Sequence, residues 1–314
     1  MKYKHIFLIV TLLAVVCVSC NRDEIFEREQ YKHVVSLLSE GTFNIFSEEH
    51  DLVDDPSTGY VAASCGGALA ITEPITINLV EDPELLNQYN FINYEMSADR
   101  FAKYLSPDRY TISDYRITIP AGERSGKMRI QIHANGLSPD STYFIPFKIA
   151  DANSEVNAEK NTALYRVYLK NYYATNKSIV EYSQRSIRTD AGGNKVNNMM
   201  TKTVFPASGN SVRLFAGNQA FESVETLIIN WAIRLTVAAD GRVTITPWSD
   251  SPNGMKIRQI DGDELYPNVF KIVDDGYRTF KTFLLCYEYT TPIDGPVYLM
   301  QEELRLEFKE ELKK

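Results

Sequence analysis

Residues 114–150 read DYRITIPAGERSGKMRIQIHANGLSPDSTYFIPFKIA. Three runs within this stretch alternate apolar and polar side chains, and segments that contain glycine or proline separate the runs. Their apolar positions are Tyr115, Ile117 and Ile119, then Met128, Ile130 and Ile132, then Tyr143, Ile145, Phe147 and Ile149. Because successive side chains of a strand point to opposite faces of a sheet, this period of two predicts half-buried strands. Short strands joined by such turns are typical of an antiparallel β-sandwich.

The same pattern extends to both sides and defines a first domain, expected over residues 31–173 as an immunoglobulin-like sandwich. Further strand-like runs occupy residues 34–38, 60–64, 68–80 and 165–170. Residues 47–58 are polar and are expected to connect two strands. One short helix is expected over residues 83–94, because Asp82 suits its N-cap and Pro83 its first position. We expect this helix to cap the end of a sheet.

A second β-rich segment follows a polar linker at residues 174–178 and is expected to form a domain over residues 178–314. Its candidate strands are residues 204–206, 211–215, 227–237, 242–246, 255–260, 268–273, 279–289 and 304–308. Asp240-Gly241 and Asp274-Asp275-Gly276 are hairpin signals between alternating runs. Short strands joined by hairpins fit an up-and-down β-barrel, with a sandwich as the alternative. The fold class predicted for the whole chain is therefore all-β.

Length and charge narrow the possible functions. The chain has 314 residues, which is enough for two domains with cores of their own. It carries 33 basic and 41 acidic residues, for a net charge of −8. A chain this acidic has no electrostatic reason to bind nucleic acid or an anionic membrane face. We therefore expect no nucleic-acid partner.

The first residues have the pattern of a secretory signal peptide, expected over residues 1–19. Lys2 and Lys4 precede an apolar run at residues 6–18. This run is too short to cross a hydrocarbon core of ~30 Å, which needs about 20 residues. A basic start, a short apolar segment and a small residue before the cut define such a signal.

The residue after the expected cut is Cys20, whose thiol can accept a diacylglycerol. Cys17 stands at the third position before the cut, where a bacterial lipoprotein signal usually has leucine. Free secretion and a retained anchor helix are the alternatives. With lipidation of Cys20, residues 20–30 are expected to form a tether, and the membrane is contacted only through the lipid.

Several motifs of the first domain carry a family resemblance. They are Tyr115–Ile119, Pro120-Ala-Gly122, Leu137-x-Pro139-Asp140, and Thr142-Tyr143 leading into Ile145-Pro146. Over about residues 30–172 the chain resembles an uncharacterised β-sandwich domain at the start of Bacteroidetes surface lipoproteins encoded with glycan-utilisation systems. These motifs are turn and strand signals, and they transfer no binding residue.

The resemblance implies more than a fold. It implies that the second domain is a lipocalin-like β-barrel and that the protein has a SusE-like role. It also implies a location on the outer membrane at the cell surface, beside an outer-membrane transporter and its glycan-binding lid protein. Asp23 and Glu24 look like the acidic signal that exports such lipoproteins to the outer face.

The sequence offers little for catalysis. The four histidines are His5, in the expected signal peptide, and His33, His50 and His133, all in the first half. The second half therefore has no histidine for a catalytic triad or a zinc site. The conspicuous acidic pairs are Asp54/Asp55, Asp261/Asp263 and Asp274/Asp275, and each lies in a turn that favours aspartate. We expect no enzyme, no metal and no cofactor, although two facing carboxylates of a glycosidase remain an alternative.

A glycan site needs aromatic rings for the C–H faces of the sugars and a few polar groups for the hydroxyls. By strand parity Trp231 shares the apolar face of residues 227–237 and is expected in the core. Trp248 follows the polar face of residues 242–246, which makes it the candidate stacking platform. Tyr266 and Tyr277 lie in nearby loops and are its candidate helpers.

The function expected from the sequence is non-catalytic capture of a polysaccharide or oligosaccharide for an outer-membrane uptake system. The alternative is a structural or adhesin-like surface subunit that binds protein partners.

Overall fold

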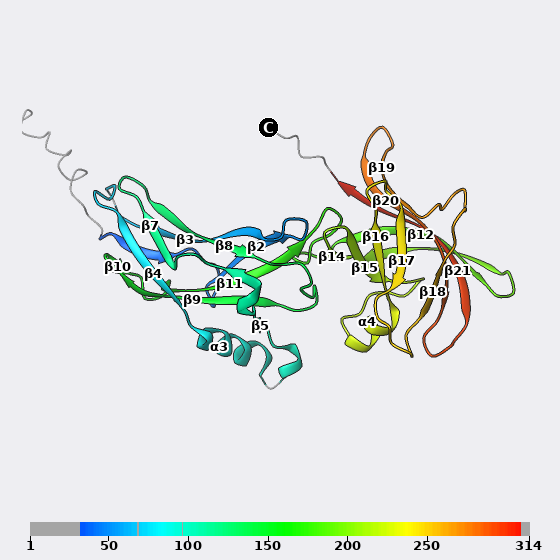
Figure 1. Cartoon of the computed structure of the whole chain (residues 1–314), viewed down its shortest axis with the longest axis horizontal. Coiled ribbons are helices and arrows are strands. Elements are labelled where there is room, and N and C mark those ends of the chain that lie inside the picture. The colour runs from blue at the N-terminus through cyan, green and yellow to red at the C-terminus, as the bar shows by residue number, and fades with distance from the viewer. Residues whose placement is uncertain (1–31, 68, 96, 309–314) are drawn as a thin grey trace, which may run out of the picture.

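The protein is described here by a computed structural model that covers residues 32–67, 69–95 and 97–308. Two β-domains follow one another along the long axis of the molecule (Figure 1). The predicted all-β, two-domain architecture is confirmed. The signal peptide, Cys20 and the tether lie outside the described residues. Within the described part of the chain, no helix is both long enough and apolar enough to cross a membrane.

The first domain is a sandwich of two sheets. Its strands are β1 (Val34–Leu37), β2 (Ile45–Asp51), β3 (Ser57–Cys65), β4 (Ile75–Glu81), β5 (Lys103–Tyr104), β6 (Tyr110–Thr111), β7 (Arg116–Ile119), β8 (Ser125–Ile132), β9 (Tyr143–Ala152), β10 (Glu155–Val156) and β11 (Thr162–Lys170). One sheet has the order β10-β1-β3-β8-β6, and the other β2-β11-β9-β4-β7, with β5 beside β9. Most pairs are antiparallel, but β1–β10, β2–β11 and β5–β9 are parallel.

The alternating residues of the opening stretch behave as their period predicts. Ile117, Ile130 and Phe147 are fully buried in the core between the two sheets. The expectation of a connection over residues 47–58 is only partly correct, because residues 45–51 form β2 and β3 begins at Ser57, which leaves residues 52–56 as the connection. Strand β2 lies at the edge of its sheet and pairs only with β11, so one of its edges and much of its face tolerate polar side chains.

Helix α3 (Pro83–Tyr94) begins where the sequence predicts. The Asp82 side chain accepts a hydrogen bond from the Glu84 backbone N–H at 3.2 Å, and Pro83 occupies the first turn. Two short 3-10 helices follow, η1 (Ala98–Arg100) and η2 (Pro107–Arg109). We expected α3 to cap the end of a sheet, and that prediction is wrong. The helix covers the outer face of β9 and β11, where Phe144 and Leu164 point away from the main core and need apolar cover.

The second domain has two further sheets. Its elements are β12 (Glu181–Asp190), β13 (Lys195–Thr203), β14 (Phe205–Ser208), β15 (Ser211–Phe215), α4 (Glu225–Trp231), β16 (Ala232–Val237), β17 (Val243–Pro247), β18 (Lys256–Gln259), β19 (Val269–Asp274), β20 (Thr279–Thr290) and β21 (Val297–Phe308). Strands β13-β12-β21-β20-β18, with β19 also beside β20, form the larger sheet, and β14-β15-β16-β17 the smaller. The two sheets enclose one core and meet at a corner, where the Val243 backbone N–H donates to the Asn268 carbonyl at 2.8 Å. Lipocalin-like closure of this domain remains a prediction.

The predicted hairpin turns are present, with Gly241 and Gly276 at φ values of 84° and 88°. The strand predicted over residues 227–237 is only half correct, because its first part is helix α4. In that part, Trp231 lies four residues after Leu227 and three after Ile228, so the three side chains share one helical face, and they pack together with Phe215. The apolar run therefore satisfies a helical period as well as a strand period.

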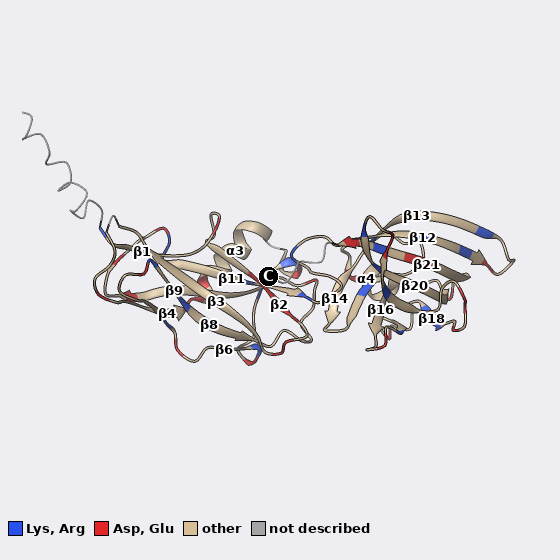
Figure 2. Ribbon diagram, turned by 90° about the horizontal axis from the view of Figure 1, so that it is seen from above, with Lys and Arg blue, Asp and Glu red and all other residues tan. Residues whose placement is uncertain are grey.

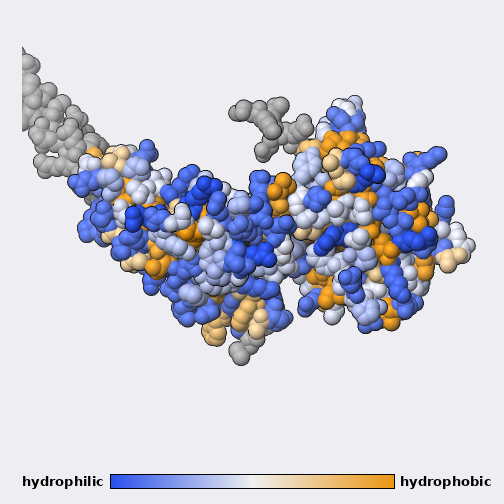
Figure 3. Space-filling model, viewed as in Figure 1, coloured by the Kyte–Doolittle hydropathy of each residue, from blue (hydrophilic) through white to orange (hydrophobic). Residues whose placement is uncertain are grey.

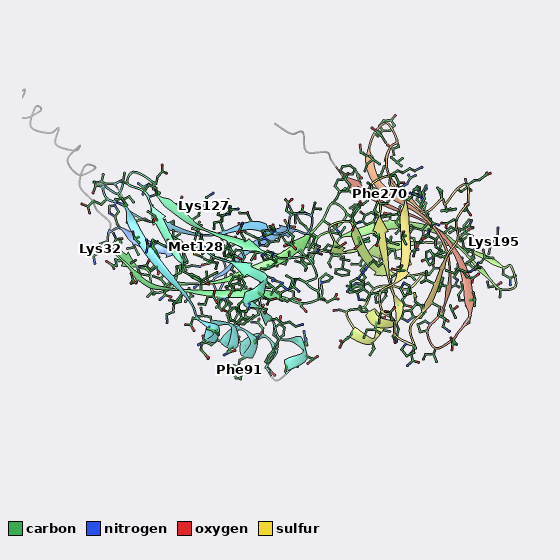
Figure 4. The ribbon with its side chains drawn as sticks, in the orientation of Figure 1. Lys32, Phe91, Lys127, Met128, Lys195 and Phe270 are labelled. Atoms are coloured by element: carbon green, nitrogen blue, oxygen red, sulfur yellow. The ribbon has the colours of Figure 1, made fainter. Side chains whose placement is uncertain are left out.

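A tight junction joins the domains. The side-chain amide of Asn171, directly after β11, donates to the carbonyls of Ser208 and Ser211 at 2.7 and 2.8 Å. The ring of Tyr173 packs on Phe270, with 4.9 Å between the centroids. Figure 4 labels Phe270 on β19, and it labels Lys195 at the far end of the second domain. The junction thus anchors the first domain to one end of the second.

Candidate functional site

Trp248, the predicted stacking platform, is half-buried directly after β17. Its ring packs beside Phe215 and α4, and its centroid lies 5.2 Å from the Arg213 guanidinium carbon and 4.8 Å from that of Arg234. Arg213 in turn pairs with Asp140 of the first domain. The predicted platform therefore lies next to the domain junction, with two cations already against its ring.

The predicted helpers lie elsewhere in the second domain. The Tyr266 ring is half-buried, and its backbone N–H donates to Asp263 at 2.9 Å. Burial raises the pKa of the Tyr266 hydroxyl above its usual value, and the negative charges of Glu303 and Asp263 add to the rise. Tyr277 is 96% exposed at the tip of the β19–β20 hairpin.

These predicted residues do not form one site. Trp248 packs with α4, which lies at the lower edge of the second domain in Figure 1. The β19–β20 hairpin that carries Tyr277 reaches the upper edge in the same view. Each residue remains a prediction as an individual ligand contact, but Trp248 and Tyr277 belong to opposite edges of the domain.

The acidic pairs of the second domain accept hydrogen bonds from the backbone of the turns in which they lie. Asp275 accepts hydrogen bonds from the backbone N–H groups of Tyr277 and Arg278 at 3.0 and 2.8 Å. These bonds lower the pKa of the Asp275 carboxyl. Asp263 accepts in the same way from the Leu265 backbone N–H at 3.0 Å. No group of three or more His, Cys, Asp or Glu side chains in the described ranges is arranged to hold a metal ion.

A groove of about 730 Å³ opens on the first domain, where β4 of one sheet lies near β6 of the other. In Figure 2 the labels of β4, β8 and β6 follow one another along the lower side of this domain. The residues that line the groove are Leu79, Val80, Glu81, Pro107, Tyr110, Thr111, Ile112 and Tyr115. Apolar side chains and tyrosines thus surround a single carboxylate.

Three tyrosine hydroxyls converge on that carboxylate, Glu81. The hydroxyl of Tyr110 donates to Glu81, with oxygen distances of 2.9 and 3.0 Å. The hydroxyl of Tyr115 donates to Oε1 at 2.5 Å, and that of Tyr104 donates to Oε2. These residues come from β4, β5, β6 and the residue before β7, so the fold itself assembles the cluster. We call Glu81, Tyr104, Tyr110 and Tyr115 the tyrosine cluster.

The electrostatics of the cluster keep its phenols neutral. Burial, strengthened by the bond to Glu81 and by its charge, raises the pKa of Tyr110 and of Tyr115 far above the usual value. Neutral phenols donate one hydrogen bond and retain lone pairs that accept others. With its three hydroxyls directed at Glu81, the cluster offers further acceptor positions to a molecule in the groove.

Sequence reasoning missed this cluster. Of its members, only Tyr115 belongs to a predicted element, as part of a strand pattern. Glu81 ends a strand, and the tyrosines follow at irregular spacings through short elements, so no helical or strand period links them. The available signal was the three tyrosines between residues 104 and 115, directly before the most regular strand of the domain.

Two family models match the chain. A model of an N-terminal domain matches residues 31–156, and a model of a C-terminal domain matches residues 161–305. The chain therefore consists of an N-terminal and a C-terminal domain of the kinds that these models describe. No curated protein matches it.

Solved structures share the two-domain fold. A protein of unknown function from Bacteroides ovatus has a TM-score of 0.64 at 17% identity, covering 87% of this chain and 94% of its own. A multidomain protein including DUF1735, from the same species, has a TM-score of 0.62 at 16% identity, covering 88% and 95%. An auxiliary nutrient binding protein from Bacteroides thetaiotaomicron has a TM-score of 0.55 at 14% identity, also covering 88% and 95%. At these identities, the likeness establishes a common fold.

Proposed function

We propose that this protein is a non-catalytic binding protein of the outer cell surface, anchored through a lipid on Cys20. It captures a polysaccharide or oligosaccharide for an outer-membrane glycan uptake system. The observation that carries the proposal is the groove of the first domain, in which three tyrosine hydroxyls converge on Glu81.

The groove has the two features that sugars need. Sugar rings rest their C–H faces on aromatic and apolar side chains, which here include Tyr110, Tyr115 and Ile112. Their hydroxyls need a small number of fixed polar partners, and the tyrosine cluster supplies them. The volume of about 730 Å³ lies within the range of small-molecule sites.

The comparisons support the biological setting. The similar structures come from Bacteroides, and one of them is an auxiliary nutrient binding protein. This fits the resemblance of the first domain to proteins of glycan-utilisation loci. The partners proposed with it are the outer-membrane transporter and its glycan-binding lid protein. The second domain contributes Tyr277 and the surface around Trp248 as further glycan contacts.

A second candidate function is a subunit that binds protein partners. The observation that favours it is an apolar pair on α3, where Phe91 and Ile92 are 69% and 63% exposed. Figure 4 shows Phe91 at the lower edge of the first domain. Figure 3 shows apolar residues at the same edge, on a face that is otherwise largely hydrophilic.

Affinity electrophoresis tests the proposed function. The soluble chain from residue 21 onward is run through gels that contain plant, host or microbial polysaccharides. We expect one glycan class to retard the chain, and the variant Tyr110→Phe/Tyr115→Phe to lose most of the retardation. Trp248→Ala tests the predicted site of the second domain in the same gels. If no glycan retards the wild-type chain, the subunit hypothesis gains, and a pull-down from outer membranes is the next step.

Two further measurements test the proposed lack of enzyme activity and the proposed lipid anchor. Prolonged incubation with the retarding glycan should release no new reducing ends, because we propose that the protein is not an enzyme. Cys20→Ser should release the full-length protein from the membrane fraction, since it removes the proposed lipid attachment.

A further inference from the structure

We propose that the groove of the first domain selects uncharged sugars and rejects sugars that carry a carboxylate or a sulfate. This inference rests on the proposed function, because it names the class of glycan that the same groove accepts. It follows from the charge and the hydrogen-bonding capacity of the residues that line the groove.

The first argument is charge. Among the residues that line the groove, Glu81 is the only charged side chain, and no lysine, arginine or histidine accompanies it. An anionic sugar seated there would face this carboxylate at close range without a compensating cation. In a partly desolvated groove, such repulsion is much stronger than in bulk water.

The second argument is that the flanking cations are engaged elsewhere. Lys148, which pairs with Val80 across the sheet, lies 3.6 Å from the carboxylate of Asp82. Arg109, next to Tyr110, donates to the carbonyl of Asn135 at 2.8 Å. These side chains are held by partners outside the groove.

A third cation follows Tyr115 in the sequence. Arg116 donates to the side-chain carbonyl of Asn78 at 3.3 Å and lies 4.0 Å from Asp114. Arg116 therefore already has acceptors on its own sheet face, in Asn78 and Asp114. An anionic ligand would have to draw one of these cations away from existing partners.

The third argument is the balance of donors and acceptors. The hydroxyls of Tyr104, Tyr110 and Tyr115 all direct their hydrogens at Glu81, so the cluster presents mainly acceptors to the groove. Sugar hydroxyls can donate to such acceptors. Ionised carboxylates and sulfates accept only, so they would leave the cluster's acceptors unpaired. Charge and hydrogen bonding thus exclude the same ligands.

The experiment compares matched sugars on the soluble chain from residue 21 onward by saturation-transfer NMR. The probes are galacto-oligosaccharides against oligogalacturonides, and xylo-oligosaccharides against their glucuronosyl derivatives. We expect the neutral member of a pair to bind at least about tenfold more tightly than the acidic member. Raising the ionic strength from about 0.02 M to about 0.5 M should reduce that ratio, since salt screens the repulsion.

Variants locate the effect. Glu81→Gln keeps the size of the side chain and removes its charge, so the preference should fall to about threefold or less. Glu84→Gln, on the exposed face of α3, is the matched control and should keep the wild-type preference. Circular dichroism verifies that both variants fold. If Glu81→Gln does not fold, the salt dependence of the wild type still tests the inference.

The outcomes separate this inference from the proposed function. If no sugar of either kind binds, the proposed function fails and takes the inference with it. If neutral and acidic sugars bind equally well, or if the preference persists unchanged in Glu81→Gln, the inference alone is wrong.

Discussion

Arg213 of the second domain and Asp140 of the first form a two-pronged ion pair across the domain junction. Nη2 donates to Oδ1 at 2.6 Å, while Nη1 donates to Oδ2. The Arg213 side chain is fully buried, and its guanidinium carbon lies 4.7 Å from the ring centroid of Phe205 and 5.2 Å from that of Trp248. Its Nε has no hydrogen-bond partner, so Asp140 is the main compensation for this charge.

Removing Asp140 should therefore destabilise the chain and loosen the junction. We expect Asp140→Ala to lower the free energy of unfolding by about 3–5 kcal/mol, because it leaves a buried cation unpaired. Small-angle scattering should show a broader distribution of domain orientations. Thermal unfolding measures the stability change.

A matched control for that prediction is Asp240→Ala. Asp240 pairs with Arg242 at 2.6 Å, but both side chains are largely exposed, so a much smaller loss of stability is expected. Equal losses in the two variants would show that the pair of the buried Arg213 with Asp140 has no special role at the junction.

The tyrosine cluster predicts how a glycan ligand responds to the loss of one hydroxyl. Tyr115→Phe keeps the ring and removes one hydrogen bond of about 1 kcal/mol, so affinity should fall about fivefold. Titration calorimetry with the retarding glycan measures the change. Tyr60→Phe, on β3 outside the lining of the groove, is the control and should bind as the wild type does. If both variants bind alike, the cluster does not contact the ligand.

The second domain contains a buried lysine, Lys202. We expect its loss to lower the free energy of unfolding by about as much as the loss of Asp140 at the junction. The Lys202 amine donates to the carbonyls of Phe215 and Gly217 at 2.8 and 2.5 Å, and burial lowers its pKa to about 8. Its charge also faces Glu302, a buried carboxyl whose pKa is raised by burial. Lys202→Met should lower the free energy of unfolding by about 3–5 kcal/mol, since it leaves the buried Glu302 carboxyl without its neighbouring cation.

Urea unfolding measures that loss, and hydrogen exchange should show faster exchange at residues 216–219. Lys195→Met, on the same strand but exposed, should change stability by no more than about 0.5 kcal/mol. A loss confined to Lys202→Met would identify the buried amine as the tie between this segment and the larger sheet.

The strands were the predictable part of this fold, because burial on one face imposes a period of two. Ile117 and Ile130 illustrate this, since both are apolar by pattern and fully buried. Helix α4 escaped prediction, because Leu227 and Trp231 lie four residues apart, a spacing that fits both a strand face and a helix face. Only the packing of the helix on Phe215 decides between them.

The candidate groove could not be predicted from the sequence, because its residues come from two sheets whose packing the sequence pattern does not reveal. Glu81 and Tyr110 are separated by 29 residues and belong to different sheets, so only the stacking of the sheets brings them together. Trp248 packs outside the main core of the second domain, in the cluster of Phe215 and α4. Its contact with Arg213, however, depends on how the first domain docks, and strand parity does not encode that.

The last prediction concerns acid, and it arises from His50 in the core of the first domain. His50 is fully buried, and its Nε2 lies 2.8 Å from the Tyr165 hydroxyl, which donates to Glu48 at 2.7 Å. Ser57 lies 3.3 Å from Nδ1. A neutral imidazole with its proton on Nε2 satisfies this network. Burial, with a smaller contribution from Lys170, lowers the pKa of His50 to about 4.

Between the folded pKa of about 4 and the unfolded value of 6.5, the unfolded chain binds more protons at this residue. Above pH 6.5 His50 is neutral in both the folded and the unfolded chain, so it adds no pH dependence to the free energy of unfolding. As the pH drops from 6.5 towards 4, the free energy of unfolding falls, because only the unfolded chain takes up the proton. We expect this residue to contribute a loss of about 3 kcal/mol over that window. Urea unfolding at successive pH values measures it. His50→Gln should flatten the slope, whereas His133→Gln, on the surface beside Asp55, should not; a slope that survives His50→Gln would assign the acid sensitivity to carboxylates instead.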